Sequence, residues 1–216
     1  MKDVSGYGFD LAGARLVARP SGALFWPAER ALVVSDLHLG RSERIARLGG
    51  GLLPPYEVDD TLMRLDQEIA SCTARMVICL GDTFDDRAAA DLGADHLLWL
   101  TRLMAGRRWI WIEGNHDPGP LTLGGEHRRD LECGALTLRH IAEPGARGEV
   151  SGHYHPKRRL AGQTRACFLT DGVRLILPAF GTYTGGMEAG HKDLRPLFAE
   201  RAFALLTGDP VRAVPF

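Results

Sequence analysis

Short apolar runs alternate with longer amphipathic stretches in the first half of the chain. Residues 31–34, 76–80 and 109–112 consist mostly of aliphatic or aromatic side chains, as buried strands do. Between these runs, residues 58–72 and 91–104 place apolar side chains at helical spacing, which predicts two amphipathic helices. Strands that alternate with helices favour a layered α/β arrangement.

Strand patterns dominate both the beginning of the chain and its second half. Residues 16–19 and 23–26 flank the turn signal Pro20-Ser21-Gly22, and a further turn precedes the run at 31–34, so the chain is expected to open with three strands. Short strands are also expected at residues 136–139, 149–151, 166–170, 174–177 and 203–206. The second half is therefore predicted to be mainly β.

Metal-binding side chains follow several of these apolar runs. Asp, Asn and His side chains with open coordination positions suit divalent ions that activate water, and a pair of such ions stabilises both the attacking and the departing oxygen of a phosphoryl displacement. The residues lie in five segments: Ser35-Asp36-Leu37-His38, Gly81-Asp82, Gly114-Asn115-His116-Asp117, Arg139-His140 and Gly152-His153-Tyr154-His155. Their order and context predict a two-metal hydrolytic site at strand ends.

The spacing within these segments suggests a role for each ligand. Asp36 and His38 are two residues apart on a segment expected to be extended, so they point the same way and chelate one ion. His153 and His155 would do the same from the opposite side of a cleft. Asp82 follows a glycine that permits a tight turn, and its carboxylate is suited to bridge two ions.

Each motif is weak by itself, because DxH and HxH pairs arise by chance and a Gly-Asn pair also forms turns. The combination is much stronger, since five of the eight histidines fall within it. For His96, His127 and His191 a structural role is expected.

Composition limits the classes of partner. The chain has 216 residues, 45% of them hydrophobic and 25% charged, and no Pro-, Ser- or charge-rich stretch divides it, so residues 1–216 are expected to form a single domain. The formal net charge of -1 provides no global attraction to nucleic acid or to anionic membranes, so any affinity for a polyanion must be local.

The cysteines and the apolar runs indicate the compartment. The four cysteines are dispersed without a CxxC pair and are expected to be reduced packing residues. The first residues form no apolar signal core, and no stretch approaches the length of a membrane-spanning helix. A cytoplasmic location without membrane association is therefore expected.

The ordered set DLH, GDTFDD, GNHD, RH and GHYH resembles the calcineurin-like metallophosphoesterase superfamily. Residues 35–41, 53–56, 152–157 and 178–186 also resemble the bacterial ligase-associated DNA damage response endonucleases of that superfamily, so the resemblance extends from about residue 30 to 187. It implies an α/β fold, namely the metallophosphoesterase four-layer α/β/β/α sandwich of two mixed sheets flanked by helices.

The resemblance also implies a ligand set. One metal would be held by Asp36, His38, Asp82 and His155, and the second by Asp82, Asn115, His140 and His153. His140 is preferred because it ends an alternating apolar stretch, and His127 is the alternative. Two divalent ions are implied, and a mixed Asp, Asn and His set without thiolates suits Mn, Fe or Zn. The resemblance favours Mn.

In the mechanism implied by this resemblance, a metal-bridging hydroxide attacks phosphorus. His116 would help to protonate the leaving oxygen and Asp117 would orient His116, although a turn or capping carboxylate is an equal alternative for Asp117. Arg41 follows the first ligands and would bind a phosphate oxygen, while Lys157 and Arg158 follow the last ligand, where a nucleic-acid strand would leave the site. For Arg44, Arg47 and Arg159 a solvated basic surface is the preferred interpretation.

The leading functional hypothesis is a phosphodiesterase that cleaves DNA, single-stranded or damaged, in repair alongside a DNA ligase and a helicase. An alternative is a pyrophosphatase or phosphodiesterase acting on a nucleotide-linked small molecule or lipid precursor, because SDLHLG followed by GNHD also resembles enzymes that cleave UDP-diacylglucosamine. Against it, the chain lacks an evident amphipathic membrane-docking helix. A noncatalytic scaffold is disfavoured, because the ligands and His116 are all present.

Overall fold

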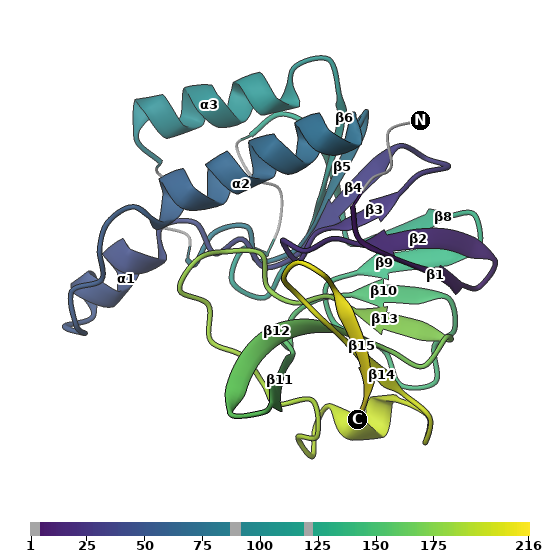
Figure 1. Cartoon of the computed structure of the whole chain (residues 1–216). Helices are drawn as coiled ribbons and strands as arrows, with labels where there is room; N and C mark the ends of the chain where they lie inside the picture. The colour runs from purple at the N-terminus through teal and green to yellow at the C-terminus, as the bar shows by residue number, and fades with distance from the viewer. Residues whose placement is uncertain (1–4, 87–91, 119–122) are drawn as a thin grey trace.

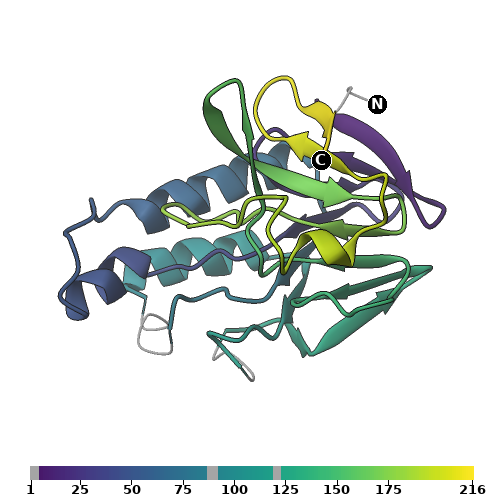
Figure 2. The ribbon, with the colours of Figure 1, turned by 90° about the horizontal axis from the view of Figure 1, so that it is seen from below.

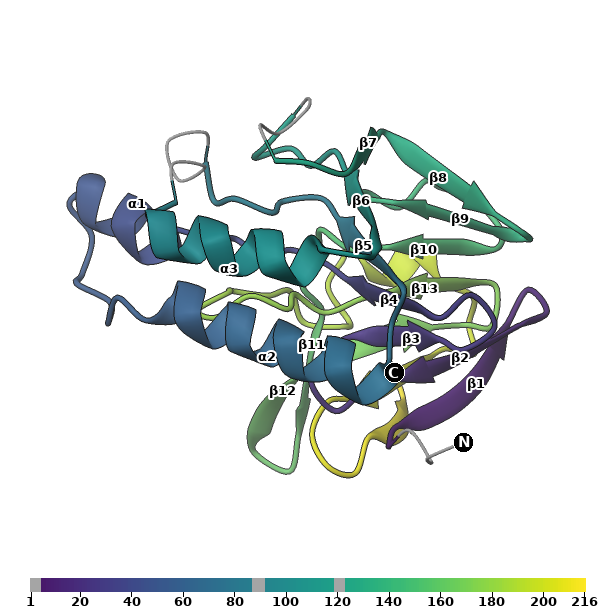
Figure 3. The same ribbon diagram turned by 90° about the horizontal axis from the view of Figure 1, so that it is seen from above.

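The computed structural model describes residues 5–86, 92–118 and 123–216, which form two β-sheets packed face to face (Figure 1). Helices α2 (Glu57–Cys72) and α3 (Ala94–Met104) lie side by side on the outer face of the first sheet, as Figure 3 shows from above. The outer face of the second sheet is covered by residues 187–202, which include the 3-10 helix η1 (Arg195–Leu197). The expected α/β sandwich of two mixed sheets is confirmed, and in the described parts of the chain its fourth layer is this loop and its single helical turn.

The first sheet contains the predicted opening strands and the predicted parallel strands. Its first four strands are antiparallel, and the fourth to the seventh are parallel. In spatial order they are β1 (Tyr7–Leu11), β2 (Ala14–Ala18), β3 (Leu24–Trp26), β4 (Ala31–Val34), β5 (Met76–Leu80), β6 (Arg108–Ile112) and β7 (Glu126–Arg128).

The second half is mainly β, as predicted, and builds the second sheet, which is nearest the viewer in Figure 2. Three of its strands, β9, β10 and β13, are parallel to one another, and the other pairings are antiparallel. In order the strands are β15 (Arg212–Pro215), β14 (Phe203–Leu206), β12 (Gln163–Thr170), β13 (Arg174–Ile176), β10 (Glu149–Ser151), β9 (Leu136–Arg139) and β8 (Asp130–Cys133), with β11 (Lys157–Leu160) paired to β12.

Strands β4 and β5 are apolar at every position because both faces of the first sheet are covered. Leu32 and Val77 contact the cluster under the helices, whereas Val33 and Ile78 contact the cluster between the sheets. Strands buried on both faces are expected to lack polar alternation. The same double burial explains why these runs were easy to recognise in the sequence.

The two predicted helices are present with shifted starts. Helix α2 begins one residue before the expected 58–72. Helix α3 begins at Ala94, and Asp91, where it was expected to start, lies outside the described residues. A further helix, α1 (Arg41–Arg47), follows the first metal motif. Across the described ranges, none of the helices has the combined length and apolar character that crossing a membrane requires.

Parallel pairing brings several strand ends to one edge of the sandwich. Val34 pairs with Cys79 and Leu80 with Ile112, so the carboxyl ends of β4, β5 and β6 are adjacent. In the second sheet, β9 runs parallel to β10. The loops that leave these five strands carry the predicted ligands, and backbone hydrogen bonds such as Gly152 N to His140 O (2.9 Å) join them.

Candidate metal centre

The predicted ligands converge at this edge in two groups. Asp36, His38 and His155 form one group, in which the donor atoms lie within 4.8 Å of one another. Asp82, His140 and His153 form the other, with the same spacing. The HxH pair is therefore divided between the groups, so the expectation from spacing that His153 and His155 chelate one ion is wrong.

In the first group, imidazole and carboxylate donor atoms face one another at short range. The Nε2 atom of His155 lies 3.2 Å from Oδ1 of Asp36 and 3.3 Å from Nε2 of His38. The other Asp36 oxygen accepts hydrogen bonds from the Ser35 hydroxyl and from the backbone N–H of His153. Oδ1 is buried and, among the described residues, faces the His155 ring without a hydrogen bond of good geometry. Burying a carboxylate oxygen without a full set of partners destabilises the folded protein, so this oxygen is suited to bind a cation.

The second group is arranged around His140. Its Nδ1 lies 2.8 Å from the carbonyl oxygen of Leu80 and donates to it, which leaves Nε2 facing the other ligands. Nε2 lies 2.9 Å from Oδ1 of Asn115, 3.3 Å from Oδ2 of Asp82 and 3.3 Å from Nδ1 of His153. Such lone-pair atoms attract one another only when a proton or a metal ion lies between them, so this group also fits a divalent ion.

Asp82 occupies the position between the groups. Its Oδ2 lies 3.3 Å from Nε2 of His140 and 4.0 Å from Nε2 of His38, while Oδ1 accepts a 2.8 Å hydrogen bond from the backbone N–H of His116. Burial raises the pKa of Asp82, but the interactions with His140, the His116 N–H and His38 outweigh it and lower the pKa to about 2. The carboxylate is therefore ionised near neutral pH and lies within 4.0 Å of a histidine from each group.

Five of the ligands have left-handed backbone conformations, which is a correction to the sequence analysis. Asp36 and His38, expected on an extended segment, have φ angles of 54° and 46°. Asp82 (46°), His153 (71°) and His155 (46°) share this conformation. Residues with a Cβ rarely adopt it, and such strain concentrates at functional sites, where the surrounding structure holds it in place.

Two glycines allow these strained loops to approach one another. A Cβ on Gly114 would lie 2.2 Å from both the backbone N and Oδ1 of Asp82. A Cβ on Gly152 would lie 1.6 Å from Oγ of Ser35. Both glycines are thus required for close contact between ligand loops from different strands.

His116 lies beside the first group, and of the two roles considered for Asp117 the structure shows that of a loop carboxylate. The His116 ring is edge-on to His38, with ring centroids 5.2 Å apart, and its Nδ1 lies 2.7 Å from the carbonyl oxygen of Asp85. The Asp117 carboxylate accepts hydrogen bonds from the backbone N–H groups of Thr83 (2.8 Å) and Phe84 (3.2 Å). The structure therefore places Asp117 as a loop-binding carboxylate, and the Asp85 carbonyl as the group that orients His116. Burial raises the pKa of Asp117.

Asp85 is a site residue that the sequence analysis did not assign. Its fully buried carboxylate places Oδ1 2.8 Å from Nδ1 of His38 and 2.7 Å from Arg41, and Oδ2 3.0 Å from Arg44. Burial raises the pKa of Asp85, but His38 and the two arginines outweigh it and lower the pKa. The bond to Nδ1 directs Nε2 of His38 toward the ligand group. The second acidic position of GDTFDD was the available signal for this role.

The basic residues predicted to bind substrate have acceptors within the protein. Arg41 binds Asp85, and its side chain is 23% exposed. Lys157 donates to the carbonyl oxygen of Thr184 (3.1 Å), and Arg158 donates to Glu188 (3.2 Å). Contact with a phosphate would therefore require these cations to share or exchange their partners.

Two of the histidines outside the motifs lie away from the ligand groups, and the third, His191, lines a hollow beside His153 and His155. His127 is on β7, where its Nε2 lies 3.2 Å from the carbonyl oxygen of Leu123, so the structure brings His140 rather than His127 into the second group. His96 lies 3.1 Å from Asp59.

Comparisons with known proteins agree with this geometry. The family profile described as calcineurin-like phosphoesterase matches residues 29–184, which include every predicted ligand. The chain belongs to this family. Among solved structures, this phosphoesterase is similar to Pseudomonas putida nuclease MPE, with 30% sequence identity and a TM-score of 0.77 over 96% of this chain and 99% of that chain. No curated protein sequence matched. Calcineurin-like phosphoesterases depend on divalent metals, and the two ligand groups are the candidate positions for them.

Proposed function

We propose that this metal-dependent phosphoesterase is a nuclease that cleaves DNA, single-stranded or damaged, and that it acts in repair alongside a DNA ligase and a helicase. The observation that carries the proposal is the pair of ligand groups that share Asp82. The similarity to a nuclease over 96% of the chain supports the choice of a nucleic-acid substrate. The link to ligase and helicase rests on the motif resemblance alone.

Two divalent ions, proposed to be Mn, fit the donor atoms. Asp36, His38, Asp82 and His155 would hold one ion, and Asp82, Asn115, His140 and His153 the other. Oδ1 of Asp36, which faces the His155 ring without a hydrogen bond of good geometry, and the lone-pair atoms around His140 support this fit. When bound, such a pair supplies an activated water nucleophile and neutralises charge on the phosphate.

The chain's own residues would perform the remaining chemistry. Asp85 holds His38 by its side chain and His116 by its carbonyl oxygen, so one loop orients a ligand and the proposed proton donor together. His116 would deliver a proton to the departing sugar oxygen, which is a poor leaving group without one. Asp117 would keep the loop at residues 83–84 in place rather than act on His116 directly.

Two hollows adjoin different ligands and suit a substrate that continues on both sides of the reacting phosphate. One hollow, of about 340 Å³, borders Asn115 and His140 and includes Arg129 and Arg139. The other, of about 570 Å³, borders His153 and His155. A phosphodiester chain passing over the centre would occupy both, whereas a small phosphate monoester would occupy neither fully.

One observation favours the alternative of a nucleotide-linked lipid precursor. Leu48 and Leu52, in the connection between α1 and α2, are 72% and 90% exposed. Exposed leucines at a loop tip are able to contact acyl chains or a membrane surface. This alternative uses the same metal centre, and therefore only the substrate distinguishes it from the nuclease.

The experiment compares cleavage of labelled single-stranded DNA, duplex DNA and a UDP-linked lipid precursor by the Mn-loaded protein, with and without a chelator. Asp82→Asn removes the shared carboxylate charge and should lower the rate about a thousandfold, because metal ions contribute several kcal/mol to the transition state. Asp10→Asn, on the exposed β1–β2 hairpin, is the matched control. Metal-dependent cleavage of single-stranded DNA that Asp82→Asn abolishes is the expected result.

Other outcomes redirect the proposal in specific ways. Hydrolysis of the lipid precursor alone would retain the metal centre and overturn the nuclease. Absence of activity on every substrate would favour a noncatalytic scaffold.

A further inference from the structure

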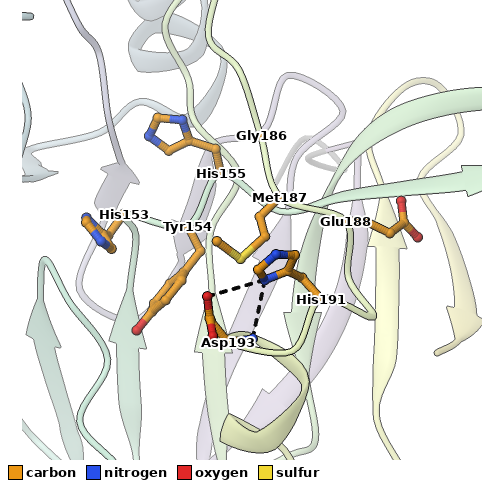
Figure 4. Close-up of a pocket in the computed structure, with 8 residues that line it drawn as sticks. All are labelled: His153, Tyr154, His155, Gly186, Met187, Glu188, His191 and Asp193. Atoms are coloured by element: carbon orange, nitrogen blue, oxygen red, sulfur yellow. Dashed lines mark hydrogen bonds and ion pairs between the residues drawn. The ribbon is translucent and has the colours of Figure 1, made fainter.

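The larger hollow beside the metal centre is lined by residues that have no role in the chemistry described so far. Its volume is about 570 Å³, and its described lining consists of His153, Tyr154, His155, Gly186, Met187, Glu188, His191 and Asp193 (Figure 4). Two of these residues are candidate metal ligands, so a molecule in the hollow would adjoin the reacting phosphate. The other six residues must therefore contact what lies next to that phosphate.

Backbone hydrogen bonds hold the walls of this hollow. Met187 N donates to the carbonyl oxygen of His155 (3.2 Å), and Lys157 N donates to that of Met187 (2.8 Å). A Cβ on Gly186 would lie 2.4 Å from the His155 carbonyl oxygen, so glycine is required where the two segments meet. On the other wall, Leu194 N donates to the His191 carbonyl oxygen (3.0 Å), and the Leu194 side chain is buried in the core. The hollow is thus preformed, so a ligand binds without a large loss of conformational entropy in the protein.

The apolar part of the lining consists of ring faces and a thioether. Figure 4 shows the rings of Tyr154 and His191 and the Met187 side chain together between the ligand His153 and Glu188. Tyr154 also packs edge-on to His153, with ring centroids 5.1 Å apart, so the ring of this metal ligand is in contact with the aromatic wall of the hollow. Aromatic rings and thioethers bind flat, polarisable groups well.

The polar part of the lining is acidic. Glu188 and Asp193 are its carboxylates, and Glu188 is already ion-paired with Arg158 (3.2 Å), so Asp193, whose Oδ2 lies 3.6 Å from the His191 ring, is the acidic group that the hollow offers to a ligand. The backbone N–H of Asp193 donates to Nδ1 of His191 (3.3 Å), which leaves Nε2 as the ring nitrogen available to a ligand. The hollow thus offers acceptors on Asp193 and a ring nitrogen on His191. The Asp193 carboxylate disfavours a second phosphate at its end of the hollow, whereas a neutral ring with N–H and acceptor groups would be recognised.

We propose that this hollow is a nucleobase subsite, which binds the unpaired base of one nucleotide adjoining the phosphate that is cleaved. The proposal rests on the proposed nuclease function and adds the structural basis for single-strand preference. The volume of about 570 Å³ is sufficient for one nucleoside. A base within a duplex has its hydrogen-bonding edge paired and its faces stacked, so it cannot enter without being extruded.

The test measures how strongly the enzyme depends on one base. Single-stranded oligonucleotides are made in which a base-free tetrahydrofuran residue replaces each nucleotide in turn around a mapped cleavage position. The Mn-loaded wild-type protein is expected to lose about fivefold to 150-fold in kcat/KM when one particular base next to the cleaved phosphate is removed. Base removal at more distant positions should have little effect.

Variants locate this dependence in the hollow. In Met187→Ala and His191→Ala, removing that base should lower kcat/KM much less than in the wild type, so that the ratio of kcat/KM with and without the base approaches one. Met63→Ala, an exposed methionine on helix α2, is the matched control and should retain the full wild-type penalty. Asp193→Asn replaces an acceptor by a group that also donates, so it should shift base preference toward bases with carbonyl acceptors without altering the fold of this exposed turn.

The outcomes separate this inference from the function on which it rests. Equal cleavage of ordinary and base-free oligonucleotides by the wild-type protein would overturn the subsite and leave the nuclease intact. The subsite would also be overturned, with the nuclease left intact, if Met187→Ala, His191→Ala and Asp193→Asn all kept the wild-type loss in kcat/KM on base removal and the wild-type base preference. Absence of metal-dependent cleavage of any oligonucleotide would overturn both.

Discussion

At the scale of single residues, a buried carboxylate outside the predicted ligand set organises the metal centre. Asp85 binds Nδ1 of His38, and its carbonyl oxygen binds His116, while its charge is balanced by Arg41 and Arg44. The carboxylate thus fixes the ring orientation of one ligand and ties helix α1 to the same loop. Outer partners of this kind commonly affect metal affinity almost as much as the ligands do.

Asp85→Asn is therefore expected to weaken Mn binding or activity by about 10- to 100-fold. The amide retains an acceptor for His38 but removes the charge that the two arginines balance. Mn titration by calorimetry, together with the cleavage rate, measures the effect. Asp86→Asn is the matched control, because the adjacent Asp86 binds the more exposed Arg47 at 2.8 Å and reaches Arg44 only at 3.7 Å, so it should change either quantity by less than about threefold. Equal losses in both variants would contradict the role of Asp85.

Gly152 provides a second test at this scale. Gly152→Ala would place a Cβ 1.6 Å from Oγ of Ser35 and 2.7 Å from Oδ2 of Asp36. The loop must move to relieve this overlap, so the variant should either fail to fold or lose metal bound through Asp36. Metal content and thermal unfolding of the purified protein measure the change. Gly93→Ala, where a Cβ would meet no described atom within 4 Å, should behave as wild type. Normal metal content in Gly152→Ala would contradict the proposed close packing.

At the scale of elements, the position of helix α2 is linked to the metal centre. Arg64 of α2 donates to the carbonyl oxygen of Phe180 (2.8 Å), and Phe180 N donates to the carbonyl oxygen of Ser35 (2.8 Å). The helix is joined to the residue that follows strand β2 by a buried ion pair, in which Arg19 Nε lies 2.8 Å from Glu68 Oε2. The segment after Leu177 thus connects the helical layer with the first ligand loop.

Glu68→Ala is expected to destabilise the fold by about 3–5 kcal/mol, because it leaves the Arg19 charge buried without its partner. Replacing both residues, as Arg19→Met with Glu68→Leu, removes the unpaired charge and should cost clearly less. Urea unfolding of the two variants and the wild type gives the free energies of unfolding. If the single variant were no less stable than the double variant, the buried pair would not fix the helix in this way.

At the scale of the whole molecule, the ligands come from both sheets. Asp36, Asp82 and Asn115 follow strands of the first sheet, and His140 and His153 follow strands of the second. Ions bound between these loops would connect the two layers at the edge of the sandwich. The inter-sheet core would then be supported by metal coordination in addition to apolar packing.

Metal binding is accordingly expected to stabilise the folded protein. At a free Mn concentration one hundred times Kd, one site contributes about 2.7 kcal/mol, which corresponds to a rise in Tm of about 5–11 °C for a chain of this size. Differential scanning calorimetry with Mn and with a chelator measures the shift. Asp82→Asn should show a much smaller shift, because Asp82 adjoins both groups. An identical shift in that variant would place the stabilising ions elsewhere.

The elements most readily predicted from the sequence were those whose burial leaves a local signal. Strands β4 and β5 were placed at their observed bounds because covered faces require apolar residues at successive positions. Strands β7 and β11 were not predicted, because Glu126-His127-Arg128 and Lys157-Arg158-Arg159-Leu160 carry few apolar residues. These strands form through pairing with neighbours, which a polar sequence does not reveal.

The sequence by itself determined the family, the layered α/β class and the residue types of the metal motifs, because each depends on short-range patterns. Only the tertiary structure decided that His140 joins Asn115, that Asp117 binds a neighbouring loop and that Asp85 orients His38. It also decided that Arg41 is already paired. These outcomes depend on contacts between strand ends that are far apart in the chain, and hydrogen-bond partners at such distances are selected by packing of the two sheets rather than by local sequence.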